Sequence, residues 1–523
     1  MEGLRQGKAE VPQGRNEGRR EVLTQLALQA EAIHLFERIH LRPELGSGLH
    51  RALGPAVQDS CERDGPIDDC LSIRDGVLFI EGCDATSLAE RFGTPLYVVS
   101  EDQLRRNVRA FQAEFQRGWP DGRVVVMPSI KANYVLALRR ILTEEGAGCD
   151  TFGPGELHAA LLTGVPPDLI SFNGSSKTAD LLYRAVSAGA RITLDAEREV
   201  ELVIAAAERA GRTARVRLRV RPDFDFPARS DFYAGRVSLR TASQMYKPGI
   251  PTESLAKSAR RLLDAPGIEL TGAMMHAGRH TTNLRVWSRM MQRFVAVIEE
   301  LREATGGWEP IEIDVGGGFA LPRDPFARSD ERRRTAPAAP SIAAYAKAIT
   351  GSLGRELSRA GISTAIRLEI EPGRSIYGNA GIHLCSVTNV KRQAHPIPYK
   401  WIETDTSETF LPDVNLERNR WTVCLAGRAS DPAKIVADVV GISCGFDVIV
   451  PAAELPEVGA GDILAFIDTG AYQDANATNF NALPRPPTVL VTGDQAELVK
   501  RGETVEDVFA RDRIPPRLAP LNR

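Results

Sequence analysis

The feature that most constrains the fold is a series of eight short apolar segments, rich in β-branched residues, with helical patterns between them. They lie at 124–127, 149–152, 169–172, 191–194, 216–220, 270–275, 311–315 and 365–370. Eight strand–helix repeats over roughly 250 residues match the size and period of a (β/α)8 barrel. A doubly wound open sheet is the competing α/β architecture, and the count of eight favours closure into a barrel.

The pattern changes on either side of this region. After about residue 378, the segments HLCSVTNVKR, TVCLAG, IVADVVG, DVIVP, ILAFID and TVLVT are short and β-rich, which predicts an antiparallel β domain. The segment CLSIRDGVLFIEG, at 70–82, predicts a hairpin that we assign to the same sheet. We therefore expect an N-terminal extension (1–69), a first piece of the β domain (70–95), the barrel (96–378) and a C-terminal β domain (379–523). Within the extension, the first twenty residues look disordered and 21–40 has helical periodicity.

Composition excludes several classes of protein. The net charge of -3 arises from 65 basic and 68 acidic residues spread along the chain, so nucleic acid and anionic membranes are poor candidates for partners. Seven cysteines without CxxC spacing fit neither a disulfide framework nor a zinc site, and we expect no metal. The polar amino terminus is not a secretory signal, and no apolar run is long enough to span a membrane. We expect a cytoplasmic protein.

In a barrel, chemistry takes place where the strands end, so the residues that follow each apolar segment are the candidates. Lys131 follows the first segment. It either marks where the strand ends at the solvent or presents its amine for covalent chemistry with a carbonyl. Asp150, Arg219 and His276 follow later segments, and Glu371 follows the eighth.

Two glycine-rich turns on neighbouring strands indicate a phosphate site. DVGGGF places Gly316, Gly317 and Gly318 directly after a strand, and EPGR supplies Gly373 and Arg374. An acid such as Glu371 beside a phosphate suits a ligand that also carries a basic nitrogen, whereas the alternative is an ion pair with Arg374. Together with the Lys131 amine, these groups describe pyridoxal 5'-phosphate.

The chain resembles the fold-type III pyridoxal-phosphate decarboxylases, the group of diaminopimelate, ornithine and arginine decarboxylases, and most of all the diaminopimelate branch. The resemblance lies in the ordered motifs GTPLYVVSEDQLRRNVRAF, SIKANY, GCDTFGPGEL, FNGSSKT, HAGR, DVGGGF, EPGRSIYGNAG, SCGFD, GDILAFIDTGAY and NATNFNALPRPPTVLV. It implies an alanine-racemase-like barrel, a β domain and decarboxylation of an amino acid.

The resemblance also implies roles for individual residues. Lys131 would carry the cofactor as a Schiff base, with a lowered pKa, and His276 would stack on the ring. Glu371 would pair with the ring nitrogen. The phosphate would be held by Gly317, Gly318, Gly373, Arg374 and Tyr472. Asp150 and Arg219 match polar positions near the cofactor, and Arg219 could equally be a structural ion-pair member.

Cys444, in SCGFD, matches a cysteine that the family delivers from a second subunit to reprotonate the intermediate. The alternative for Cys444 is a buried core thiol. The same resemblance implies a homodimer with shared active sites.

Three departures from the family concern the choice of substrate. The acid that usually follows the cysteine and binds a far amino group is Gly445 here, and Asp447 is the candidate to replace it. The Arg-Pro segment that recognises a distal carboxylate is altered, leaving Arg418 and Arg420 as candidates, and HAGRH places Arg279 where a small residue is common. We expect a divergent amino-acid decarboxylase, and the three departures leave open whether diaminopimelate or another amino acid is its substrate. A racemase and a non-catalytic, cofactor-binding regulatory protein are the alternatives.

Overall fold

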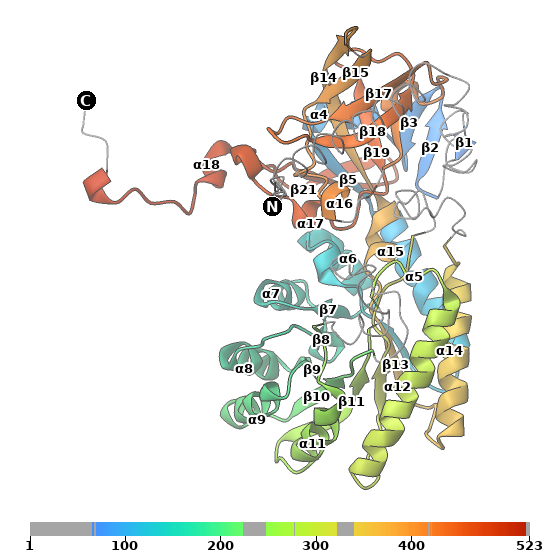
Figure 1. Ribbon diagram of the computed structural model, residues 1–523, viewed down its shortest axis with the longest axis vertical. Coiled ribbons are helices and arrows are strands. Elements are labelled where there is room, and N and C mark those ends of the chain that lie inside the picture. Colours follow the sequence, from blue (N-terminus) through green and yellow to red (C-terminus); the bar gives the residue numbers. More distant parts are fainter. Residues whose placement is uncertain are drawn as a thin grey trace, which may run out of the picture.

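The chain forms a parallel barrel of strands below a second, mostly antiparallel β region (Figure 1). The computed structural model describes residues 65–66, 69–222, 247–276, 278–321, 339–396, 398–416, 419 and 421–518. The predicted helix at 21–40 lies outside the described residues.

All eight predicted barrel strands are present, in the order β6-β13-β12-β11-β10-β9-β8-β7. Their bounds are β6 Val124–Val126, β7 Cys149–Thr151, β8 Ile170–Phe172, β9 Arg191–Leu194, β10 Ala214–Arg219, β11 Ile268–Met274, β12 Glu312–Asp314 and β13 Arg367–Ile370. The two end strands of this order also meet, because the Gly148 N–H donates to the Val126 carbonyl at 3.0 Å. A parallel bridge joins Ser129 to Asp150 just beyond them. The barrel architecture is therefore confirmed.

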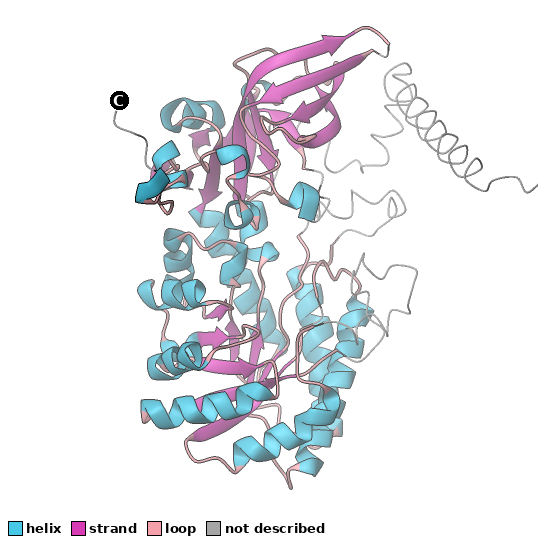
Figure 2. Ribbon diagram, turned by 60° about the vertical axis from the view of Figure 1, so that its left-hand side comes forward, coloured by secondary structure: helices cyan, strands magenta, loops and turns pink. Residues whose placement is uncertain are grey.

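Helices surround these strands in the lower part of the molecule (Figure 2). They are α5 Glu101–Gly118, α6 Leu136–Glu144, α7 Pro154–Leu162, α8 Ala179–Ala188, α9 Arg198–Ala210, α11 Thr252–Leu263, α12 Leu284–Ala304 and α14 Ile342–Arg359. Side chains cap several of their amino ends: the Ser100 and Thr178 hydroxyls accept from backbone N–H groups of the first turn. Buried residues such as Phe111, Phe115 and Trp287 pack these helices onto the barrel, which is the largest hydrophobic core in the described part of the chain.

The second region is built on a nine-stranded sheet with the main order β18-β17-β15-β14-β5-β20-β21, to which β19 and β16 are attached through β14. Its strands are β5 Leu96–Ser100, β14 Gly381–Gln393, β15 Tyr399–Thr404, β16 Val423–Leu425, β17 Ile435–Val440, β18 Val448–Leu455, β19 Ile463–Ile467, β20 Thr488–Thr492 and β21 Gln495–Lys500. The β-rich C-terminal region predicted from the sequence is thus present.

The hairpin at 70–82 forms as predicted but does not join this sheet, so that assignment was wrong. Its strands, β2 Leu71–Arg74 and β3 Val77–Ile80, pair with β1 Gly65–Pro66 and β4 Cys83–Asp84 in a separate four-stranded sheet. After β4, helix α4 (Ala85–Phe92) packs its buried face into the same core. The small sheet shares a core with β5 and β14 by packing side chains onto them, not by adding a strand.

The strand that does cross into the C-terminal sheet is β5, which we had placed at the start of the barrel range. It pairs antiparallel with β14 and parallel with β20. All five of its residues are buried, as in a barrel strand. The hydrophobic pattern alone therefore could not tell whether this strand belongs to the barrel or to the C-terminal sheet.

Past β21, helix α18 (Val505–Val508) and the residues after it extend away from the body, and residues 509–518 are all exposed (Figure 1). Within the described ranges, none of the helices is long and apolar enough to cross a membrane.

Candidate active site

Lys131 lies in a short turn that follows the first barrel strand. After β6, the chain forms a 3-10 turn, η1 Ile130–Ala132, whose first and last side chains are fully buried. The turn is tied to the C-terminal region because the Tyr472 N–H donates to the Ala132 carbonyl at 2.7 Å. Lys131 itself is 45% exposed. Two buried apolar anchors thus hold one lysine at the mouth of the barrel.

The Lys131 amine is held by a carboxylate at the end of the next strand. Lys131 Nζ lies 2.7 Å from Asp150 Oδ2 and 3.2 Å from the Ser129 hydroxyl. Asp150 is buried and also accepts from Ser129 Oγ at 2.6 Å and from Asn173 Nδ2 at 2.8 Å. Partial desolvation opposes the charged amine, but Asp150, Tyr472 and Glu371 together raise the pKa of Lys131 above its usual value. The expected lowering of its pKa is therefore wrong for this chain without cofactor.

His276 is a neutral imidazole beside the glycine turn. Its Nδ1 accepts a hydrogen bond from the Gly317 N–H at 3.0 Å. Burial, with Arg219 and Lys131 nearby, lowers the pKa of His276 to about 3. Arg219 lies 3.5 Å from Asp195, so it is an ion-pair member that also faces the site.

The two glycine turns lie against each other. Gly316 and Gly318 have positive φ angles of 69° and 111°, which favour glycine. A Cβ atom at Gly317 would come within 2.2 Å of the Glu371 carbonyl oxygen, and one at Gly373 within 2.8 Å of the Tyr472 hydroxyl. These positions have no room for side chains, as an anion cradle requires, while the Gly316 and Gly317 N–H groups donate to Asp314 and His276.

Glu371 is buried between polar neighbours. It accepts a hydrogen bond from the Asn173 side-chain amide. Burial, Asp150 and Asp314 raise the pKa of Glu371 well above its usual value.

Arg374 is held elsewhere, so the alternative ion pair between Glu371 and Arg374 is absent from the described residues. Arg374 Nη1 lies 2.8 Å from Asp413 Oδ2, and its guanidinium stands 4.7 Å from the centre of the Tyr472 ring. Asp413 belongs to the altered segment that precedes Arg418 and Arg420, and these two arginines lie outside the described residues.

Cys444 lies in the loop between β17 and β18 and is exposed, which excludes a buried core thiol within one chain. Its backbone N–H and its sulfur each bond to the Asn481 side chain, at 2.9 and 3.3 Å. The neighbouring Phe446 is 98% exposed. The structure therefore groups Lys131 with the other strand-end residues but leaves Cys444 on an open surface.

Asp447 orders this loop through hydrogen bonds to its backbone. It is buried, and its two carboxylate oxygens accept from the backbone N–H groups of Glu408 and Ser443, at 2.6 and 2.7 Å. Glu408 Oε1 lies only 3.2 Å from the place where a Cβ atom at Gly445 would be. Arg279 is exposed and follows Gly278, whose carbonyl lies against the Gly318 turn.

Four polar residues of this region were not among the predicted site residues: Ser129, Asp314, Asp413 and Glu156. Asp314 stands in the DVGGGF motif, and that position could have drawn attention to it. Ser129 and Glu156 likewise stand in the motifs SIKANY and GCDTFGPGEL. Asp413 carries no such signal, because its role depends on a contact between separate loops.

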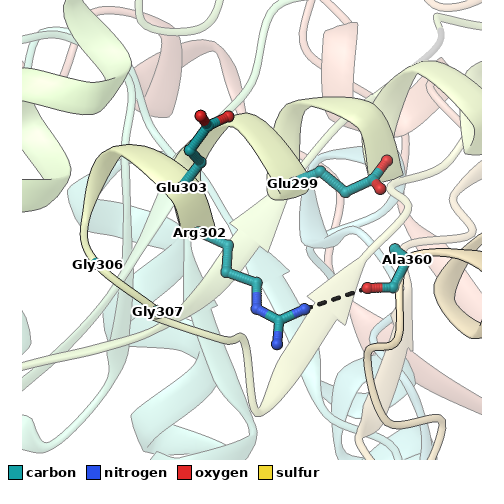
Figure 3. A pocket seen from close by; sticks show the side chains of 6 residues that line it. All are labelled: Glu299, Arg302, Glu303, Gly306, Gly307 and Ala360. Carbon is teal, nitrogen blue, oxygen red and sulfur yellow. Dashed lines mark hydrogen bonds between the residues drawn. The ribbon is translucent and has the colours of Figure 1, made fainter.

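The groove in Figure 3 lies apart from these residues. It has a volume of about 380 Å³ and is lined by Glu299, Arg302, Glu303, Gly306, Gly307 and Ala360. Arg302 donates to the Ala360 carbonyl at 3.1 Å. Because α12 ends there before β12 begins, the groove lies at the amino ends of the strands, opposite the site.

Comparison with known proteins gives a consistent result. Residues 101–378 match the family described as "Pyridoxal-dependent decarboxylase, pyridoxal binding domain". The chain is 30% identical to a diaminopimelate decarboxylase of Methanocaldococcus jannaschii over 459 residues, covering 86% of this chain and 98% of that protein. It is 32% identical to one of Pseudomonas fluorescens over 454 residues, covering 86% of this chain and all of that protein. The crystal structure of the M. jannaschii enzyme superposes with a TM-score of 0.77 at 29% identity, over 86% of this chain and 99% of that one.

Proposed function

The chain belongs to the family of pyridoxal-dependent decarboxylases, and from this membership we propose that it removes the α-carboxylate of an amino acid with pyridoxal 5'-phosphate as cofactor. The observation that carries the proposal is Glu371, a buried acid bonded to Asn173 that has no ion-pair partner among the described residues. Such an acid can pair with the protonated ring nitrogen of the cofactor. A racemase is disfavoured by an acid at this position.

The residues fit the cofactor on several counts. Lys131 offers an amine, the neutral His276 ring can lie flat against an aromatic ring, and the Gly317 and Gly373 turns have no room for side chains. When bound, the cofactor supplies the electron sink that accepts the electrons of the broken bond.

In this proposal Lys131 holds the cofactor, and Asp150 orients the amine through its ion pair. Glu371 faces the ring nitrogen. The phosphate is held by Gly316, Gly317, Gly318, Gly373, Arg374 and Tyr472. Arg219 supports His276 by keeping a positive charge beside it, which favours the neutral imidazole.

We further propose that the enzyme is a cytoplasmic homodimer in which Cys444 serves the active site of the other subunit. Three observations support it: Cys444 is exposed, Phe446 beside it is almost fully exposed, and the six described cysteines are free thiols. Cys444 would then return a proton to the substrate carbon.

The substrate is proposed to differ from diaminopimelate. Both Asp447 oxygens are engaged by backbone N–H groups, so Asp447 is better suited to shaping the loop than to binding substrate. Glu408 is the acid beside Gly445, and we assign it the place of the missing acid, facing a distal amino group of the substrate. Arg279, Arg418 and Arg420 stay candidates for substrate carboxylates.

The experiment measures cofactor binding and carbon dioxide release with the same purified protein. We expect a visible absorption band that is lost in Lys131→Ala and kept in Lys257→Ala, which changes an exposed lysine of α11. We also expect carbon dioxide from at least one member of a panel of α-amino acids, including several with distal amines. A colourless wild-type protein after incubation with the cofactor, or a coloured one that releases no carbon dioxide from any substrate, contradicts the proposal.

A further inference from the structure

Asp150 is a buried carboxylate beside the Lys131 amine, and three side chains of the described residues donate to it. It is 2% exposed. Its Oδ2 accepts from Lys131 Nζ at 2.7 Å and from the Ser129 hydroxyl at 2.6 Å. Its Oδ1 accepts from Asn173 Nδ2 at 2.8 Å. Burial would raise the pKa of Asp150, but these three donors together lower it below its usual value. A buried carboxylate is costly unless its oxygens keep such partners.

Lys131 is the donor that Asp150 loses when the lysine reacts. A lysine amine attacks a carbonyl carbon only after it has lost its proton, so the ion pair with Asp150 is given up at that stage. Asn173 cannot replace it, because its amide faces the other carboxylate oxygen and also donates to Glu371. Asp150 Oδ2 then depends on the Ser129 hydroxyl.

Ser129 is held in place by its backbone, independently of the Lys131 amine. It is 3% exposed, and its N–H donates to the Pro372 carbonyl at 3.1 Å, in the EPGR turn after β13. A parallel bridge joins its backbone to Asp150. The Ser129 hydroxyl also accepts from Lys131 Nζ at 3.2 Å, so one side chain contacts both members of the ion pair. This hydroxyl can therefore stay on Asp150 while the amine moves.

We propose that Ser129 is a positioning residue that keeps Asp150 hydrogen-bonded and in place while the Lys131 amine leaves the ion pair to bind a carbonyl ligand. Asp150 can then receive the amine again when the ligand departs. The alternative is a hydroxyl that contributes only to stability, whose loss would cost the same with or without the amine. The meaning for the cofactor rests on the proposed function, whereas the coupling of Ser129 to Lys131 can be measured in the cofactor-free protein.

The first test is a double-mutant cycle with the cofactor-free chain, at a pH near 8. Lys131→Met removes the charged donor, and Ser129→Ala removes the hydroxyl. After Ser129→Ala alone, Asp150 Oδ2 keeps the amine as its partner, but in the Lys131→Met protein it keeps neither. We therefore expect Ser129→Ala to lower the urea midpoint of unfolding roughly twice as far, or more, in Lys131→Met as in wild type.

Ser352→Ala is the matched control for this cycle. Ser352 is also 3% exposed, and its hydroxyl bonds to that of Ser288 at 3.0 Å, between α14 and α12. Its substitution should shift the urea midpoint equally in the wild-type and Lys131→Met proteins. Equal shifts for Ser129→Ala in the two proteins overturn the proposal, because they are the result that a merely stabilising hydroxyl predicts.

The second test measures the affinity of the full chain for pyridoxal 5'-phosphate from the visible absorption band. In Ser129→Ala the reacting lysine is intact, but its bond to the cofactor leaves Asp150 Oδ2 without a side-chain donor, and this cost falls on binding. We expect the dissociation constant to rise roughly tenfold while the band is still formed. Ser352→Ala should bind as wild type does. An unchanged dissociation constant in Ser129→Ala overturns the proposal.

The two measurements keep this inference separate from the proposed function. If the wild-type protein forms no visible band with the cofactor, the proposed function fails, and the unfolding midpoints still decide the role of Ser129. Should the protein with both Lys131→Met and Ser129→Ala not fold, the dissociation constant of Ser129→Ala alone decides it.

Discussion

At the scale of single residues, Glu156 makes the free energy of unfolding depend on pH. It lies in the first turn of α7, where its carboxylate accepts from the Phe152 N–H at 2.8 Å. Burial and the nearby Asp150 raise its pKa to about 7. In the unfolded chain it ionises near pH 4.5, so between those values the unfolded state has lost its proton and the folded state has not.

This difference predicts that the free energy of unfolding of the cofactor-free protein falls as the pH rises from about 4.5 to about 7, by roughly 2 to 3 kcal/mol from this group. Glu156→Gln should lack that decline. Urea denaturation of both proteins at several pH values checks it, and parallel curves for the two proteins would contradict it.

The site residues show what a sequence can and cannot predict at this scale. Lys131, His276, Glu371 and the glycines stand at strand ends in ordered motifs, and barrel geometry brings strand ends together. The pairing of Arg374 with Asp413 could not be predicted, because it joins a barrel loop to a loop of the second region. The raised pKa of Lys131 was equally hidden, since it depends on the distance to Asp150.

At the scale of elements, the loop between β17 and β18 depends on one buried acid. Asp447 accepts two backbone hydrogen bonds, and its own φ of 46° is in the left-handed region. Asp447→Ala leaves both N–H groups without their acceptor, which costs about 1 to 3 kcal/mol. We expect faster amide hydrogen exchange over 441–447 and a lower kcat, with the absorption band of the bound cofactor unchanged.

The control for this prediction is Ser443→Ala, which removes only a weak 3.4 Å contact to the Gly445 N–H in the same loop. It should leave both exchange and kcat close to wild type. Equal exchange rates in wild type and Asp447→Ala would show that the loop is ordered by other contacts.

Elements were largely predictable, and the exceptions share a cause. The eight barrel strands and the main C-terminal strands carry continuous or alternating apolar patterns bounded by turn residues. Which sheet a strand joins depends on edges and packing, so the hairpin at 70–82 was assigned to the wrong sheet, and β5, which pairs in the C-terminal sheet, fell within the range expected for the barrel. The local sequence pattern predicts where strands form, whereas the pairing of strands depends on contacts across the whole fold.

At the scale of the molecule, the proposed homodimer makes a quantitative prediction. Lys131→Ala and Cys444→Ala should each be nearly inactive alone. If the two residues act in one site from different subunits, mixed dimers carry one intact site of two, and random pairing restores about a quarter of wild-type activity. Activity after subunit exchange, followed with the dimer fraction by light scattering, measures this, and no recovery in confirmed mixed dimers contradicts the shared site.

The early position of strand β5 in the sequence has a consequence for folding during synthesis. It precedes the barrel in sequence, yet Tyr97 next to its start bonds to the Phe410 carbonyl 313 residues later. During synthesis, this mostly apolar strand therefore leaves the ribosome long before β14 and β20 exist to pair with it. The barrel can fold from consecutive repeats, but the second region must wait, with β5 open to misassembly in the interval. We therefore expect productive folding in the cell to depend on protection of that strand until β14 and β20 have been made.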